Sequence, residues 1–442
     1  MGHPLSLLYR SGQRTDLSSP WKYFPDRSDM TNEPFQPLHD NFAYIIVAIA
    51  FFIMVIVWGA NYSFGVFFTP LLKEFGWTRA ITSGPFSLAI FIEGFGGMFM
   101  GRICDRFGPR LVVTVCAVFF GTGYILMTKI TSAWHLYLYY GLMVGIGLSG
   151  SYVPLSSTIA HWFDKRRGLM IGIVSSGIGA GTLIISPIAN HLILLYGWRF
   201  SCLSVGLLAL ILIVVFAQLL RLPDKNSVRK HTVPNELQEH CRCGPISPGC
   251  VGEAMRDKSF WMLCTILLCW GIIIFVILVH IAPFAIEMGF SETQAANILA
   301  IFGGAVFFAK IILGITADRI GSRLTFIIGL GFMSAGLFWL LISQALGSLY
   351  LFAIVYAFGY GCGSVIMPTI VAEMFGLLSH GILLGVVNFS ACIGCAIGPV
   401  LAGRLFDKSG SYHEVFVLMT ILSVITLMMG FFIKPNERRC EE

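Results

Sequence analysis

Long apolar segments separated by short polar ones dominate the chain from residue 42 onward. Each is about 20 residues or longer, the length that a helix needs to cross the hydrocarbon core of a bilayer. The segments fall at 42–71, 79–101, 109–130, 134–160, 168–195, 199–221, 259–286, 293–316, 322–343, 348–375, 380–405 and 413–434. This pattern predicts an all-α membrane protein with twelve transmembrane helices in two groups of six.

The same pattern divides the chain into five parts. We expect a disordered cytoplasmic tail at 1–41, a six-helix half at 42–221, a cytoplasmic linker at 222–258, a second six-helix half at 259–434 and a cytoplasmic tail at 435–442. The first apolar run begins too far along the chain, and is too long, to be a cleaved secretory signal. Either Met1 or Met30 can serve as the first residue.

Composition supports a membrane protein. Hydrophobic residues make up 56% of the chain and charged residues only 12%, whereas soluble domains carry about 25% charged residues. The net charge of +6 resides in loops and tails, so it does not indicate nucleic-acid binding. Cysteines inside the apolar segments are expected to be buried thiols. The linker cysteines Cys241, Cys243 and Cys250 lack the usual spacing of a zinc site.

A charged decapeptide occurs once in each half, at Gly101–Arg110 and at Gly314–Arg323. Both copies read G-x-x-x-D-R-x-G-x-R, and each lies between two apolar segments. We expect a tight turn in which Asp105 and Asp318 sit against helix N-termini and accept hydrogen bonds from nearby arginines. Such contacts would act as a gate that opens when the halves move apart, although the alternative is a loop that only fixes topology. The predicted gate residues are Asp105, Arg106, Arg110, Asp318, Arg319 and Arg323.

Basic loops orient the helices. With the N-terminus in the cytoplasm, both decapeptides and the run Asp164-Lys165-Arg166-Arg167 lie on the cytoplasmic side, as the positive-inside rule requires. We therefore expect a multi-pass protein of the plasma (inner) membrane with both termini cytoplasmic.

Polar side chains inside apolar segments are candidates for function, because burying them in lipid is costly. Lys310 lies four residues before the second decapeptide and Glu93 eight residues before the first. Lys310 can bind a substrate or snorkel to the interface, and Glu93 can carry a proton or make a neutral helix contact. Five further residues can line a cavity or only join helices, and His280 can face an outer vestibule or be packed. These mid-segment residues are Asn61, Tyr62, Tyr152, Tyr360 and Asn388.

Several motifs resemble those of one transporter group. The decapeptides resemble the signature loop of the major facilitator superfamily, and six plus six spans fit its fold. More local runs resemble monocarboxylate transporters and oxalate–formate antiporters across about residues 42–434. These runs are His161-Trp162-Phe163-Asp164-Lys165-Arg166-Arg167-Gly168-Leu169 through Gly181, Gly65-Val66-Phe67-Phe68, His280-Ile281-Ala282-Pro283, and Gly398-Pro399 with Gly403 and Asp407.

The resemblance implies a role for Lys310, since monocarboxylate transporters carry an arginine at the matching place that pairs with the substrate carboxylate. Two departures stand out. Tyr62 replaces their segment 1 lysine, and Val306 replaces an aspartate four residues before the cation. Segment 11 offers only Arg404, near its outer end, whereas oxalate–formate antiporters use two cations. One mid-membrane cation favours one carboxylate.

We therefore expect a secondary transporter of small monocarboxylates of the lactate or pyruvate type, working with protons as a symporter by alternating access. No ATP-binding loop and no catalytic constellation occur in the sequence, so we expect neither an enzyme nor a cofactor. The expected partners are the substrate, protons and the lipid bilayer, and a single-span accessory protein stays open. The alternatives are an oxalate/formate-type exchanger and a non-transporting membrane receptor.

Overall fold

A computed structural model describes residues 37–223 and 252–433, except for 78, 164, 165, 253, 344 and 378. Contacts separate Met1–Phe42 from a second unit, Ala43–Glu442, and the helices beyond Phe42 belong to that second unit. Most of the predicted N-terminal tail, most of the central linker with its cysteines, and the predicted C-terminal tail lie outside the described residues.

The first half contains six candidate membrane spans, some of them built from more than one helix. Its elements are α1 (Pro37–Tyr62), α2 (Phe64–Phe75), α3 (Arg79–Phe107), α4 (Pro109–Met127), α5 (Ala133–Leu136), the π-helical η2 (Tyr137–Val144), α6 (Gly145–Ser149), α7 (Tyr152–Trp162), α8 (Arg167–Tyr196) and α9 (Trp198–Leu219).

The second half contains six more candidate spans, one helix each. They are α12 (Lys258–Glu287), α13 (Glu292–Ile320), α14 (Ser322–Ile342), α15 (Leu346–Phe375), α16 (His380–Ser409) and α17 (Tyr412–Phe432). The described part of the chain has no strand. The prediction of an all-α protein with twelve spans in two groups of six is thus confirmed.

Two spans are less regular than the apolar pattern indicates. In the first, Ser63 separates α1 from α2, and its Oγ donates to the backbone oxygen of Gly59 at 2.7 Å. Such a bond to the preceding turn competes with the helical ladder and bends a helix. The fourth span passes through the π-helical η2, a stretch that contains the weak helix former Gly141. The hydrophobicity of the sequence does not indicate either the break at Ser63 or the π-helical stretch.

The decapeptides are mostly helical, so the predicted extent of their turns is wrong. Helix α3 continues to Phe107 and α13 to Ile320. Each turn is a single residue, Gly108 in the first copy and Gly321 in the second. These glycines have φ angles of 86° and 88°, which side chains with a Cβ rarely adopt. The chain therefore reverses at the second glycine of each decapeptide. We call this end of the helix bundle the decapeptide end.

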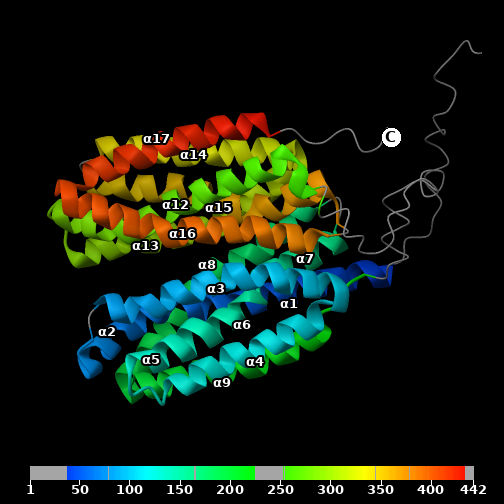
Figure 1. Ribbon diagram of the computed structural model, residues 1–442, viewed down its shortest axis with the longest axis horizontal. Coiled ribbons are helices and arrows are strands. Elements are labelled where there is room, and N and C mark those ends of the chain that lie inside the picture. The colour runs from blue at the N-terminus through cyan, green and yellow to red at the C-terminus, as the bar shows by residue number, and fades with distance from the viewer. Residues whose placement is uncertain are drawn as a thin grey trace, which may run out of the picture. The chain divides into compact units, whose positions relative to one another are not determined.

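The two halves contact each other through α3 with α16 and through α8 with α13 (Figure 1). Glycines allow this approach, because a Cβ built at Gly168 would lie 2.6 Å from the backbone oxygen of Gly314. A Cβ built at Gly381 would lie 2.5 Å from the backbone oxygen of Gly101. The first glycine of each decapeptide thus meets a glycine of the other half.

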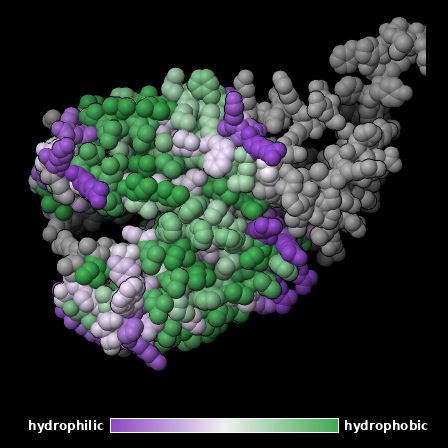
Figure 2. Space-filling model, in the orientation of Figure 1, coloured by the Kyte–Doolittle hydropathy of each residue, from purple (hydrophilic) through white to green (hydrophobic). Residues whose placement is uncertain are grey.

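The outer surface of the helices is apolar, as a bilayer requires. Figure 2 shows hydrophobic residues over most of the visible face, and large side chains such as Phe52, Leu208 and Phe308 are more than half exposed. Figure 2 also shows a hollow between the two halves at the end where α2 lies. Polar side chains, in contrast, are buried where the halves meet.

Candidate functional site

Lys310 lies in the contact between α13 and α8, where the two halves meet. Its side chain is fully buried, and Nζ donates to the backbone oxygen of Ser175 at 3.1 Å. Nζ also lies 5.2 Å from the centre of the Tyr360 ring, within the range of a cation–π contact. Among the described residues, no carboxylate forms an ion pair with Lys310. This ammonium therefore has polar contacts but no counterion.

Lys310 is fully buried, whereas a lysine that snorkels keeps its ammonium group in water. Helix α13 ends at Ile320, and ten residues of helix rise about 15 Å. The apolar pattern places the end of this helix at residue 316, four residues too early. Lys310 is therefore held deep between the halves rather than at an interface with water.

Glu93 occupies a similar place on α3, facing α16. Its side chain is 3% exposed, and both carboxyl oxygens accept hydrogen bonds from the other half. The Asn388 amide donates to Oε1 at 3.2 Å, and the Cys392 thiol donates to Oε2 at 3.1 Å. The protonation state of Glu93 thus bears directly on a contact between the halves.

Three tyrosines lie near these two charged groups. Tyr62 interacts electrostatically with both Tyr360 and Glu93, and Tyr152 interacts with Glu93 and Tyr360. Tyr360 in turn faces Lys310. Glu93 and Lys310 therefore share Tyr360 and its two tyrosine neighbours as their surroundings.

A proline explains how Tyr152 crosses to the other half. Pro368 lies inside α15 and has no N–H to donate to the backbone oxygen of Ser364, four residues earlier. The Tyr152 hydroxyl donates to that oxygen instead. The free carbonyl therefore becomes an attachment point between the halves.

Two of the predicted site residues lie elsewhere. Asn61 is buried inside the first half, where its Oδ1 accepts a hydrogen bond from Tyr140 at 2.9 Å. His280 lies inside the second half, with Nε2 3.1 Å from the Pro399 oxygen and Nδ1 3.3 Å from the Tyr412 hydroxyl. Lys310, Glu93, Tyr62, Tyr152, Tyr360 and Asn388 are brought together, whereas these two join helices within their own halves.

The second decapeptide binds a helix N-terminus across the halves. Asp318 accepts hydrogen bonds from the backbone amides of Gly168 at 2.7 Å and Leu169 at 2.8 Å. Both amides belong to the first turn of α8, where free N–H groups and the helix dipole favour an anion.

The first decapeptide makes the corresponding contact with α16, but more loosely. Asp105 accepts from the Gly381 amide at 3.3 Å and from the Ser157 hydroxyl at 3.4 Å. Its carboxyl group also interacts with the backbone amide of Ile382, the next residue of α16. Two histidines reinforce this side: His161 Nε2 lies 3.1 Å from the Leu377 oxygen, and His380 Nδ1 lies 3.1 Å from the Ser157 hydroxyl.

The arginines of the decapeptides do not pair with these aspartates among the described residues, so that part of the prediction is wrong. The terminal arginines instead reach neighbouring helices of their own halves. Arg110 donates to Gln218 on α9 at 2.7 Å, and Arg323 donates to the Phe431 oxygen on α17 at 2.8 Å. Arg106 and Arg319 are exposed.

Sequence reasoning missed several groups at these contacts. Cys392 appeared only as a small buried residue, and Ser157, Ser175, His161 and His380 were not singled out as site residues. Thiols, hydroxyls and backbone oxygens leave no pattern in a single sequence. The structure identifies these groups because each lies on a helix that packs beside a charged side chain.

The chain matches the family model of the Major Facilitator Superfamily over residues 48–309 and 281–441. It is 27% identical to human monocarboxylate transporter 11 over 414 residues, which covers 91% of this chain and 84% of that protein. It is also 27% identical to chicken monocarboxylate transporter 4 over 406 residues, covering 88% and 84%. These matches confirm the resemblance that the motifs indicated.

Solved structures show the same fold. The proton:xylose symporter XylE superimposes with a TM-score of 0.70 at 16% identity, over 90% of this chain and 97% of that one. The transporter FucP, in its outward conformation, gives a TM-score of 0.69 at 13% identity, over 89% and 99%. At these identities the likeness concerns the arrangement of the helices alone.

Proposed function

We propose, from the premise that this chain belongs to the Major Facilitator Superfamily, that it carries small monocarboxylates of the lactate or pyruvate type together with protons. It is a multi-pass integral membrane transporter and not an enzyme. The observation that carries the proposal is the fully buried Lys310, which contacts a backbone oxygen and an aromatic ring but, within the described part of the chain, no carboxylate.

A buried ammonium without a counterion is costly, by several kcal/mol in an apolar interior. A substrate carboxylate can supply that counterion by displacing the Ser175 oxygen from Nζ. Because Ser175 lies on α8 and Lys310 on α13, this exchange would alter a contact between the halves. Substrate binding at the Lys310 Nζ atom would then be coupled to movement of the two halves.

Glu93 is the proposed proton carrier. As a carboxylate it accepts from Asn388 and Cys392, but a protonated carboxyl group has one oxygen that must donate. Protonation therefore changes the contact between α3 and α16, just as the substrate changes the contact between α8 and α13. The names of related monocarboxylate transporters support the choice of substrate.

The decapeptide end is the proposed cytoplasmic gate. Asp105 and Asp318 each join one half to a helix N-terminus of the other, so both contacts must break when that end opens. The structure then corresponds to a state closed toward the cytoplasm. We also propose that both termini are cytoplasmic and that the protein lies in the plasma membrane.

Uptake of labelled lactate into proteoliposomes tests the role of Lys310. Lys310→Ala should lower the uptake rate by about tenfold or more, because a hydrogen bond between charged groups contributes about 1.5–3 kcal/mol. Lys129→Ala, which removes an exposed lysine, is the matched control and should transport normally. Wild-type rates for Lys310→Ala would rule out the substrate role.

An imposed proton gradient tests Glu93. Glu93→Gln keeps the shape of the side chain but cannot release a proton, so lactate exchange should continue while accumulation driven by the gradient is lost. Full accumulation would assign the proton to another group. Counterflow of oxalate outside against formate inside, independent of protons, would instead establish the exchanger alternative.

A further inference from the structure

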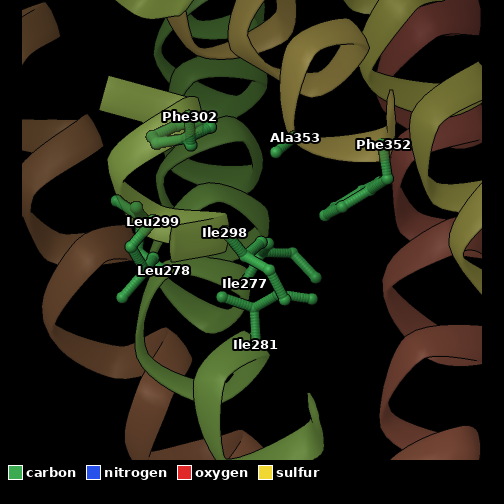
Figure 3. Close-up of a pocket in the computed structure, with 8 residues that line it drawn as sticks. All are labelled: Ile277, Leu278, Ile281, Ile298, Leu299, Phe302, Phe352 and Ala353. Atoms are coloured by element: carbon green, nitrogen blue, oxygen red, sulfur yellow. The ribbon is translucent and has the colours of Figure 1, made fainter. Parts of the chain in front are cut away.

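The pocket between α12, α13 and α15 is too apolar to bind a carboxylate. All eight side chains that line it, among them Ile277, Phe302 and Phe352, are hydrocarbon (Figure 3). It therefore offers no hydrogen bond to an anion. Polar groups that can bind a carboxylate lie instead where Lys310 of α13 meets α8.

Ser175 lies on the face of α8 that packs against α13. A Cβ built at Gly172 would lie 2.6 Å from the backbone oxygen of Lys310. One built at Gly179 would lie 3.5 Å from the backbone oxygen of Gly303. Because Ser175 comes three residues after Gly172 and four before Gly179, it shares their face of the helix. Between these two glycines, the chain thus places a hydroxyl group against α13.

The side chain of Lys310 extends along α8 toward Ser175. The two helices are antiparallel, since Gly168 meets Gly314 and Gly172 meets Lys310. A helical side chain tilts toward the N-terminus of its helix, so Lys310 points from the level of Gly172 toward Ser175. Its Nζ accordingly donates to the Ser175 backbone oxygen at 3.1 Å. An ammonium group has three N–H donors, and this is the single hydrogen bond that Nζ makes with the described residues.

The Ser175 hydroxyl has no hydrogen-bond partner among the described residues, although it is fully buried. Other buried helical serines donate to a backbone oxygen of the preceding turn, as Ser176 does at 2.7 Å and Ser334 at 3.1 Å. A buried donor that is left unpaired costs stability, so buried polar groups normally have a partner. A ligand that brings an acceptor to Lys310 would also supply one to Ser175.

We propose that Ser175 is a second binding residue for the substrate carboxylate, which accepts hydrogen bonds from the Ser175 hydroxyl and the Lys310 ammonium group together. This inference rests on the proposed function and adds a contact from the first half to the one from the second. The carboxylate replaces the Ser175 backbone oxygen at Nζ, and that oxygen keeps its place in the hydrogen-bond ladder of α8. Each half then holds the same anion, as a substrate site between the halves requires.

Affinities for two acids test this contact, in lactate exchange with equal pH on both sides. Ser175→Ala should raise the KM for lactate by about tenfold, because a hydrogen bond to a charged group is lost. It should raise the concentration at which propanoate inhibits by the same factor, because both acids carry the carboxylate. The maximal rate should stay the same, as expected when a contact with bound substrate is removed uniformly.

Ser176→Ala is the matched control. Ser176 is the next residue of α8 and equally buried, but its hydroxyl already donates to the Ile173 oxygen. Both values should therefore match those of the wild-type protein. A loss in Ser175→Ala that affects lactate but not propanoate would assign Ser175 to the lactate hydroxyl and overturn the proposed contact, and so would an unchanged KM.

Melting curves separate a binding role from a structural one. Without substrate, Ser175→Ala should melt at the wild-type temperature or higher, because it removes a buried hydroxyl that has no partner. The same concentration of lactate should then stabilise this variant less than it stabilises the wild-type protein. Equal stabilisation by lactate would overturn this inference alone. A wild-type protein that neither transports lactate nor is stabilised by it would overturn the proposed function as well.

Discussion

The two ends of the helix bundle are held together in different ways. At the decapeptide end, side chains cross between the halves, as in the Asp318 contacts with Gly168 and Leu169. At the opposite end, the contacts described stay within one half, as in the bidentate pair of Arg199 with Glu74 at 2.9 and 2.6 Å. The proposed alternating-access cycle would therefore have to break the first kind of contact and could keep the second throughout.

The crossing contacts are themselves unequal. Asp318 is exposed but makes two short bonds to backbone amides. Asp105 is half-buried, and its bonds to Gly381 and Ser157 are longer. The same ten-residue motif thus makes shorter hydrogen bonds to α8 than to α16. We expect the contact with α16 to break first.

Gly314→Ala should have the largest effect. Its Cβ would meet the backbone of Gly168 well inside van der Waals contact, and a backbone cannot move aside as a side chain does. The closed population at the decapeptide end should fall about tenfold to a hundredfold, since overpacking costs about 1–3 kcal/mol. Distances between spin labels on introduced non-canonical residues at Leu111 and Leu324, which are 51% and 49% exposed on α4 and α14, report that population.

Gly303→Ala is the matched control for this substitution. Gly303 lies on the same helix, but a Cβ built there meets nothing within 4 Å. Its label distances should match those of the unmodified protein. Closed-state distances in Gly314→Ala as well would mean that the glycine contact does not limit closure.

Asp318→Ala should rank second. The change leaves the amides of Gly168 and Leu169 without their acceptor, and loss of such an N-terminal contact costs about 1–2 kcal/mol. The same label pair should show the closed population reduced by roughly tenfold. Asp318→Asn, which keeps an acceptor but loses the charge, should fall between Asp318→Ala and the unmodified protein.

Asp105→Ala should have a smaller effect, about threefold or less, because its bonds are 3.3 and 3.4 Å long and weaken with distance. The histidine contacts of His161 and His380 remain in this variant. If Asp105→Ala opened the decapeptide end more than Asp318→Ala does, the contact with α16 would be the stronger of the two.

Glu74→Gln should have the smallest effect and should not open the gate. Hydrogen bonds from Arg199, and then from Trp198, hold the pKa of Glu74 below its usual value. A depressed folded-state pKa stabilises the protein above the unfolded pKa, and that contribution is lost as pH falls through the folded pKa. Because the pair is exposed, melting curves should show a loss of about 1 kcal/mol or less at neutral pH, and a smaller one in acid.

Much of this arrangement could be predicted from the sequence because lipid makes polar residues conspicuous. Lys310 and Glu93 stood out for that reason, and the repeated decapeptide located the ends of their helices to within a few residues. The direction in which a side chain points was harder to predict, as Asn61 shows. Helices that are apolar on every side have no polar face from which to judge orientation, so neither Asn61 nor His280 could be assigned to an interior or an interface beforehand.

The separate positions of Lys310 and Glu93 have an electrical consequence for the proposed cycle. With both groups ionised, the empty site holds one positive and one negative charge. After it takes up a carboxylate anion and a proton, it again holds equal numbers of each. Neither crossing of the membrane would move net charge, so transport should generate no steady current and should not respond to the membrane voltage.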